Sequence, residues 1–221
     1  MQIVIPTFPR LTALDAVGPY EVLQRVPGAE VVFAGAERGP VRTDNGMLGL
    51  VADVRLDEVP SPDVVLVPGG FGTRALLSGG PVVDWVRAAH ETSTWTTSVC
   101  TGALVLAAAG VLDGVDAVTH WAAMDTLGEL GAVPTPGRYH VRGKVITAAG
   151  VSAGIDMALW LAIRLADEET AKVIQLYLEY EPEPPFHEGS LSTASPRTIE
   201  AAREFGARAR QQSDATQGSR G

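Results

Sequence analysis

Hydrophobic residues in this chain occur in short runs of two kinds, which alternate along most of its length. One kind is rich in β-branched residues and short enough for strands, at residues 3–5, 30–34, 64–67, 95–99 and 115–119. The other kind has helical spacing, at residues 20–25, 82–91, 101–109, 122–130 and 155–166. This alternation predicts an α/β fold in which helices cover both faces of a mostly parallel central sheet.

The run at 64–67 is apolar at every position, as expected of a strand that is buried on both faces. Residues 139–146 predict a hairpin with Arg142 and Gly143 near its turn. Ligands of open parallel sheets bind at the carboxyl ends of the strands, so a site is expected in the loops that follow the predicted strands.

The composition changes after Tyr180. Residues 181–185 form an extended, proline-rich connector, which is followed by a polar amphipathic stretch at 196–211 and a tail of Ser, Gly and Gln. We therefore expect one domain over residues 1–181, and a connector, a short helix and a loose tail over residues 182–221.

Composition and charge narrow the choice of partners. The 221 residues carry a formal net charge of -9, which opposes binding to the phosphate backbone of nucleic acids. No apolar stretch approaches the roughly 18 residues of a membrane-spanning helix. The N-terminus has no basic segment typical of a signal peptide. We expect a cytoplasmic protein that acts on a small molecule and binds neither nucleic acid nor membrane.

The single cysteine, Cys100, lies between a predicted strand and a predicted helix. Small residues, Ser98 and Gly102, stand two positions before and after it, which is the pattern of a sharp strand-to-helix turn that presents a nucleophile. Free amides at the start of the helix would favour the thiolate over the thiol. The alternative is a buried structural cysteine, which is a common fate for a lone free thiol.

Glycines follow the strand at 64–67, and they allow the backbone to turn sharply and point the amide of Gly70 into a site. Gly70, Gly72 and Ala75 also match the spacing of a dinucleotide-binding loop. No acidic residue ends a second strand about 20 residues later, however, and the chain has no Gly-Lys-Ser or Gly-Lys-Thr. We therefore expect no nucleotide cofactor.

The segment from Thr12 to Asp15 matches a capping box, and Pro19 is suited to the first turn of a helix. A structural role for Asp15 is the simpler interpretation of this spacing. The position of the segment favours a functional one, because the loop after the first strand of a parallel sheet reaches the same edge as Cys100 and Gly70.

His120 lies at the end of the predicted strand 115–119. It is either a base for the thiol or a hydrogen-bonded residue at the sheet edge, and its spacing does not decide between them. Trp121 and Phe71 are candidates for an apolar wall around a substrate, or for plain core. No pair of histidines has metal-ligand spacing and there is no second cysteine, so no metal site is expected.

Four motifs in the same order resemble those of the DJ-1/PfpI superfamily, over about residues 2–181. They are Leu14-Asp15-x-x-Gly18-Pro19-x-Glu21-Val22, Val67-Pro68-Gly69-Gly70, Val99-Cys100-Thr101-Gly102 and Thr119-His120-Trp121. This resemblance implies a three-layer sandwich of the flavodoxin-like type that class I glutamine amidotransferases share. Asp15 in place of the more usual Glu, with Cys100-Thr101 and residues 176–180, is similar to the isonitrile hydratase branch.

That branch hydrates an isonitrile to an N-substituted formamide without a cofactor and is typically a homodimer. The resemblance implies that Cys100 is the nucleophile and that Asp15 is the acid beside it. It also implies that Thr101 contributes its side chain and amide, and that Gly70 donates its amide to the pocket.

Other activities occur on the same fold. A glyoxalase or deglycase, a thiol hydrolase and a non-enzymatic sensor of cysteine oxidation remain alternatives. The superfamily also occurs fused to helix-turn-helix domains, for which residues after Tyr180 offer neither room nor a basic stretch. A class I amidotransferase is discarded, because His187 and Glu188 are adjacent and do not form the His-x-Glu pair that it needs.

Overall fold

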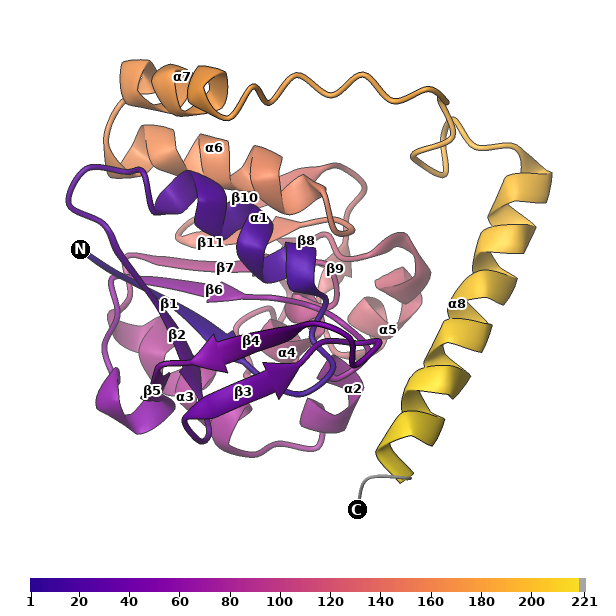
Figure 1. The fold of residues 1–221 in the computed structure, drawn as a ribbon, viewed down its shortest axis with the longest axis horizontal. Helices are drawn as coiled ribbons and strands as arrows, with labels where there is room; N and C mark the ends of the chain where they lie inside the picture. The colour runs from indigo at the N-terminus through magenta and orange to yellow at the C-terminus, as the bar shows by residue number, and fades with distance from the viewer. Residues whose placement is uncertain (219–221) are drawn as a thin grey trace.

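The computed structural model describes residues 1–218, and a sheet of seven strands forms its centre (Figure 1). The strand order is β10-β11-β7-β6-β1-β2-β5, and every neighbouring pair is parallel except the hairpin β10-β11. The strands are β1 (Gln2–Thr7), β2 (Glu30–Gly35), β5 (Val54–Arg55), β6 (Val64–Val67), β7 (Trp95–Val99), β10 (Tyr139–Arg142) and β11 (Val145–Ala148). The expected mostly parallel sheet and hairpin are confirmed.

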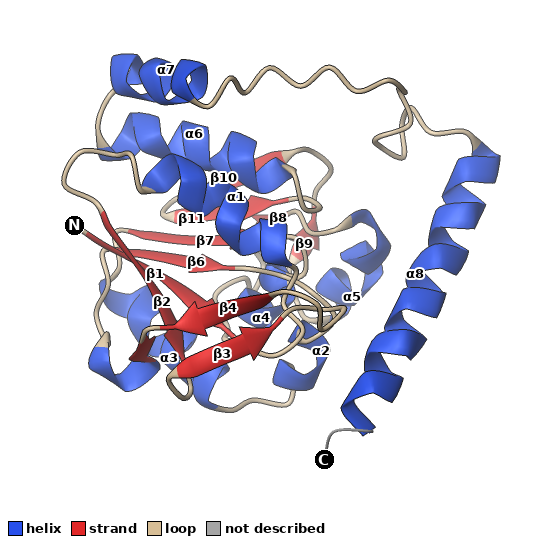
Figure 2. Cartoon of the chain, viewed as in Figure 1, coloured by secondary structure: helices blue, strands red, loops and turns tan. Residues whose placement is uncertain are grey.

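Helices cover both faces of this sheet, which gives the three-layer α/β sandwich (Figure 2). The helices of one layer are α1 (Ala13–Leu23), α6 (Ala153–Leu165) and α7 (Glu168–Tyr177). Those of the other layer are α2 (Thr73–Leu76), α3 (Pro81–Thr92), α4 (Gly102–Ala108) and α5 (Met124–Glu129). The strand β6, apolar at every position, is buried along its whole length between them.

Two predicted elements are wrong in extent or place. Helix α1 begins at Ala13, well before the predicted residue 20, and Pro19 lies inside it instead of at its start. In place of the predicted strand 115–119, the structure has only the two-residue strand β8 (Asp116–Ala117). It pairs with β9 (Val133–Pro134) outside the main sheet. A second two-stranded sheet, β3 (Gly39–Arg42) with β4 (Gly49–Ala52), was not predicted.

The chain after α7 leaves the sandwich as an extended segment and ends in α8 (Pro196–Gly218), which runs along one side of the molecule (Figure 1). The predicted short helix is therefore long, and it continues through most of the tail that was expected to be loose; residues 219–221 lie outside the described part. The division into residues 1–181 and 182–221 stays a proposal.

Within residues 1–218, no helix is both long enough and apolar enough to cross a bilayer.

Candidate active site

Loops from the carboxyl ends of β1, β6 and β7 meet at one point, as their place in a parallel sheet predicts. The backbone amide of Thr12, after β1, donates to the carbonyl of Gly69, after β6, at 2.9 Å. The amide of Gly70 in turn reaches Thr101, after β7. Cys100 and Asp15 lie at this junction, so the three expected loops converge.

The predicted sharp turn at Cys100 is present. Its φ of 55° lies in the left-handed region that most side chains avoid, and its amide donates to the carbonyls of Ala148 and Ala149 at 3.0 and 2.9 Å. Gly102 is required by packing, because a Cβ there would lie 2.2 Å from the carbonyl oxygen of Val67. The thiol is held at a fixed place, and only 5% of the residue is exposed.

Asp15 is fully buried and its carboxyl turns toward the loops, not toward its own helix. Its Oδ2 accepts a hydrogen bond from the amide of Gly69 at 2.9 Å, while its Oδ1 is buried with no hydrogen-bond partner among the described residues. The predicted capping box is wrong, since the Thr12 side chain makes no capping hydrogen bond and its hydroxyl instead donates to Asp44. A buried carboxyl with an unused oxygen is costly to stability and is typical of a functional group.

Burial raises the pKa of Asp15 to about 7, against the opposing effects of the Gly69 amide and the Cys100 thiol. Burial also raises the pKa of Cys100, and the negative charge of Asp15 adds to the rise. Hydrogen bonds to the backbone of Thr101 and Val151 act in the other direction and are weaker. Burial thus opposes the thiolate that the helix start was expected to favour, because loss of water around the sulfur outweighs the hydrogen bonds from the nearby backbone.

Thr101 joins the loop after β7 to the loop after β6. Its hydroxyl accepts from the Gly70 amide at 2.9 Å and donates to the Gly70 carbonyl at 3.1 Å. The Gly70 amide is thus already occupied, whereas the sequence predicted that it would face a ligand. Its role in this structure is to fix the hydroxyl of Thr101 beside Cys100.

His120 and Trp121 both line the cavity at Cys100. His120 lies one position before a short 3-10 helix and accepts from the Ala122 amide through Nδ1, at 3.2 Å. Burial, with the positive charge of Arg74, lowers its pKa, so the ring is neutral and carries its proton on Nε2. His120 therefore lines the cavity and is also hydrogen-bonded to the local backbone, and it follows a short loop instead of a strand of the main sheet.

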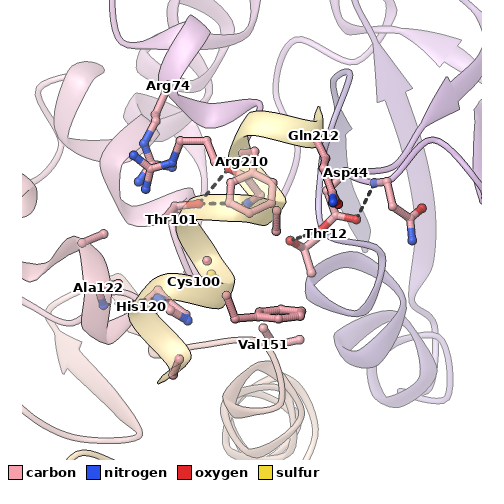
Figure 3. A pocket seen from close by; sticks show the side chains of 18 of the residues that line it. Thr12, Asp44, Arg74, Cys100, Thr101, His120, Ala122, Val151, Arg210 and Gln212 are labelled. Atoms are coloured by element: carbon pink, nitrogen blue, oxygen red, sulfur yellow. Dashed lines mark hydrogen bonds between the residues drawn. The ribbon is translucent and has the colours of Figure 1, made fainter. Parts of the chain in front are cut away.

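The cavity has a volume of about 650 Å³, in the range of small-molecule sites (Figure 3). Phe71 and Thr101 line it, as expected, together with residues that sequence reasoning missed. These come from the turn between β3 and β4, from α2 and from α8, and include Asp44, Asn45, Met47, Arg74, Ala202, Phe205, Gly206, Ala209, Arg210 and Gln212. In α8 the helical spacing of Ala202, Phe205, Gly206 and Ala209 was the available signal.

A second question is whether the structure offers a set of side chains that could bind a metal ion. Among the side chains that the structure describes, those of residues 1–212, no group of three or more His, Cys, Asp or Glu is arranged to hold a metal ion. The chemistry that the site can perform with its own groups is nucleophilic attack by sulfur and proton transfer by a carboxyl.

Residues 1–163 match the DJ-1/PfpI family. The chain belongs to this family. It is 41% identical over 204 residues to an isonitrile hydratase from Pseudomonas putida, a match that covers 92% of this chain and 89% of the relative. A crystal structure of a THiJ/PfpI family protein from Pseudomonas syringae superposes with a TM-score of 0.90 at 35% identity, covering 97% of this chain and 89% of that one.

The family also contains regulators. An HTH-type transcriptional regulator from Pseudomonas aeruginosa is 31% identical over 71% of this chain, but the match spans only 47% of the regulator. Membership therefore establishes the flavodoxin-like fold and leaves the activity to be argued from the site.

Proposed function

We propose that this protein hydrates an isonitrile to an N-substituted formamide, with Cys100 as the nucleophile. The observation that carries the proposal is the fully buried carboxyl of Asp15 at the junction of loops that also holds Cys100, with a pKa raised to about 7. Similarity to an isonitrile hydratase over almost the whole chain supports the same reaction.

The first step uses a single proton held by the Asp15 and Cys100 pair. Above a pH of about 7 the carboxyl is ionised and the thiol is not. As sulfur forms a bond to the terminal carbon of the isonitrile, the S–H bond breaks and its proton passes to Asp15 and then to that carbon. The product is a neutral thioimidate on Cys100, and Asp15 is a carboxylate again.

Water completes the reaction. Its oxygen adds to the thioimidate carbon, and Asp15 takes one of its protons and passes that proton to the nitrogen. The carbon–sulfur bond of the resulting tetrahedral adduct then breaks, the hydroxyl proton returns to sulfur, and the formamide leaves. The oxygen and one proton of the water enter the formamide, and its other proton replaces the one that the thiol gave to carbon, so the elements of one water are added overall without a redox step.

Neighbouring groups have positioning roles in this proposal. The hydroxyl of Thr101 is fixed by its two hydrogen bonds to Gly70, which hold the loops on both sides of the thiol together. His120 offers an N–H to the reacting molecule, and Trp121 and Phe71 supply apolar surface in the same cavity.

A small substrate panel tests the proposal. The purified protein is incubated with methyl and cyclohexyl isonitrile, methylglyoxal and an activated ester, and product formation is followed by chromatography. We expect formamide from the isonitriles and none after Cys100→Ser. Turnover of methylglyoxal or the ester alone would favour a glyoxalase or a hydrolase, and a stable mass gain after mild peroxide without any turnover would favour an oxidation sensor.

A further inference from the structure

Two arginines from distant parts of the chain line the cavity that holds Cys100. Arg74 lies in the last turn of α2, and Arg210 lies on α8. Figure 3 shows their side chains extending toward one another, on the side of the cavity where Thr101 lies. This side of the cavity therefore carries two positive charges.

An acidic residue, Asp44, also lines the cavity, but it lies on the opposite side, beside Thr12 (Figure 3). Its carboxyl accepts hydrogen bonds from the Thr12 hydroxyl at 3.1 Å and from the Asn45 amide at 2.9 Å. Burial, and after it the positive charge of Arg74, lowers the pKa of His120, which lines the cavity as well. The charge of Arg74 thus acts on groups inside the cavity.

Arg210 differs from two other arginines of α8. The guanidinium of Arg208 lies 3.4 Å from the carboxylate of Glu204. That of Arg203 lies 4.0 Å from Glu200. Among the side chains that the structure describes, none forms an ion pair or a hydrogen bond with Arg210. In a chain with a net charge of -9, the two arginines make the cavity a local exception that attracts anions.

We propose that the substrate carries a carboxylate, which Arg74 and Arg210 bind while Cys100 reacts with the other end of the molecule. A guanidinium suits a carboxylate because its planar N–H groups can donate two parallel hydrogen bonds. Arg210 is exposed, so the carboxylate would lie at the rim of the cavity and remain partly hydrated. The inference rests on the proposed isonitrile activity for the reacting end, and adds the chemical class of the rest of the substrate.

The first test compares two isonitriles of the same shape and different charge, 3-isocyanopropanoate and 3-isocyanopropanamide. We expect the ratio of their kcat/KM values, acid over amide, to fall by about tenfold in Arg210→Gln, because a charge-assisted hydrogen bond to the carboxylate is lost. Arg210→Lys keeps the charge and should retain part of the preference. The matched control is Arg208→Gln, on the same helix and outside the cavity lining, which should leave the ratio unchanged.

A second readout needs no turnover. Cys100, the single cysteine, is alkylated with iodoacetyl-β-alanine and with its primary amide, and the two rates are followed by mass spectrometry. The rate ratio of acid to amide should fall by about tenfold in Arg210→Gln and in Arg74→Gln, but not in Arg208→Gln. In the wild type the ratio should also fall as the salt concentration rises, because the carboxylate is bound near solvent.

The two readouts separate this inference from the proposed activity. If no isonitrile is hydrated but the alkylation ratio falls in Arg210→Gln, the proposed activity fails and the carboxylate site stands. If Arg210→Gln behaves as Arg208→Gln does in alkylation, the carboxylate site is overturned, whether or not isonitriles turn over. An unchanged kcat/KM ratio in Arg210→Gln, in a protein that does hydrate isonitriles, overturns it as well.

Discussion

At the scale of single residues, the burial and hydrogen bonding of Asp15 are the strongest indication of where the site lies. A helix-capping carboxylate would be partly solvated, whereas this carboxyl is fully buried and uses one oxygen for the Gly69 amide. Gly69 has no room for a side chain, because a Cβ there would lie 2.7 Å from Asp15 Oδ2. The loop after β6 is thus shaped around the acid, which is the arrangement expected where chemistry takes precedence over stability.

The raised pKa of Asp15 predicts a pH-dependent stability. The folded protein holds this proton up to about pH 7, while the unfolded chain releases it near 3.8. The contribution of Asp15 to stability is therefore full below about pH 4 and is lost as the pH rises to 7, by roughly 4 kcal/mol. We expect Asp15→Asn to lack this loss and to be more stable than the wild type at pH 8 in urea unfolding.

The control for this measurement is Asp53→Asn, which changes an exposed carboxyl. It should keep the pH dependence of the wild type. Parallel stability curves for Asp15→Asn and the wild type between pH 4 and 8 would show that Asp15 is not held protonated by burial.

The same pKa predicts the pH profile of catalysis. Attack by sulfur needs a base for the thiol proton, and Asp15 becomes that base as it ionises through a pH of about 7. We expect kcat/KM for an isonitrile to rise through pH 7 and to level off above it, and the residual activity of Asp15→Asn to lack this rise. A wild-type profile that is flat or falls across pH 7 contradicts this use of the proton.

At the scale of elements, the strand-to-helix turn between β7 and α4 sets the position of Cys100. The backbone of Cys100 is held in a left-handed conformation, and Gly102 packs against the carbonyl of Val67 in the neighbouring strand. This contact couples the turn to the loop that carries Gly69 and Gly70. Position 102 therefore requires a small residue for two reasons: the tight turn and the close packing against the neighbouring strand.

The variant Gly102→Ala tests whether position 102 requires glycine. The added Cβ would overlap the Val67 carbonyl, so we expect a loss of stability of about 1–3 kcal/mol or more and a loss of isonitrile turnover. The matched control is Gly206→Ala in α8, where a Cβ meets open space and alanine favours the helix. Thermal unfolding of both variants makes the comparison, and equal stabilities would contradict the packing role of Gly102.

Elements with a strong local pattern in the sequence were predicted more accurately than elements whose pattern is weak or depends on the rest of the fold. Strands β6 and β7 were predicted with their observed bounds, because continuous apolar or β-branched runs are local signals. The start of α1 was misplaced because Pro19, normally a mark of a first turn, is accommodated inside the helix. The sheet of β3 and β4 was missed, since its short strands are only partly buried and lack a strong apolar pattern.

The same limit applies to the site. Cys100 and Asp15 were expected to lie together because each is in a motif next to a strand of the sheet, and the structure brings them to one junction. The occupied amide of Gly70 and the wall formed by α8 were not, because both depend on contacts between segments far apart in the sequence. The direction of the Cys100 pKa also depends on burial, which the position of the residue at a helix start did not reveal.

At the scale of the whole molecule, α7 presents an apolar surface on the outside of the sandwich. Val173, Leu176 and Tyr177 are spaced as one helical face, and Leu176 is 78% exposed. An exposed apolar stripe of this kind is typical of a contact with another protein. We propose that it belongs to the interface of a homodimer, the assembly that the family resemblance implies.

Light scattering at micromolar concentration tests this assembly. We expect twice the chain mass of 23.2 kDa for the wild type and a shift to the monomer in Leu176→Glu, which places a charge in the stripe. Glu168→Gln, a charge change at an exposed position outside the stripe, should remain dimeric. A monomeric wild type, or a Leu176→Glu variant that is still fully dimeric, would contradict the proposed interface.

The most direct measurement on the proposed mechanism is isonitrile turnover by Asp15→Asn, made beside thermal unfolding of the same preparation. Cys100→Ser serves as the inactive baseline, because it removes the proposed nucleophile whatever Asp15 does. If Asp15 moves the thiol proton to the isonitrile carbon, turnover should fall by about a hundredfold or more while the protein stays folded. A folded Asp15→Asn variant with turnover close to that of the wild type would contradict it.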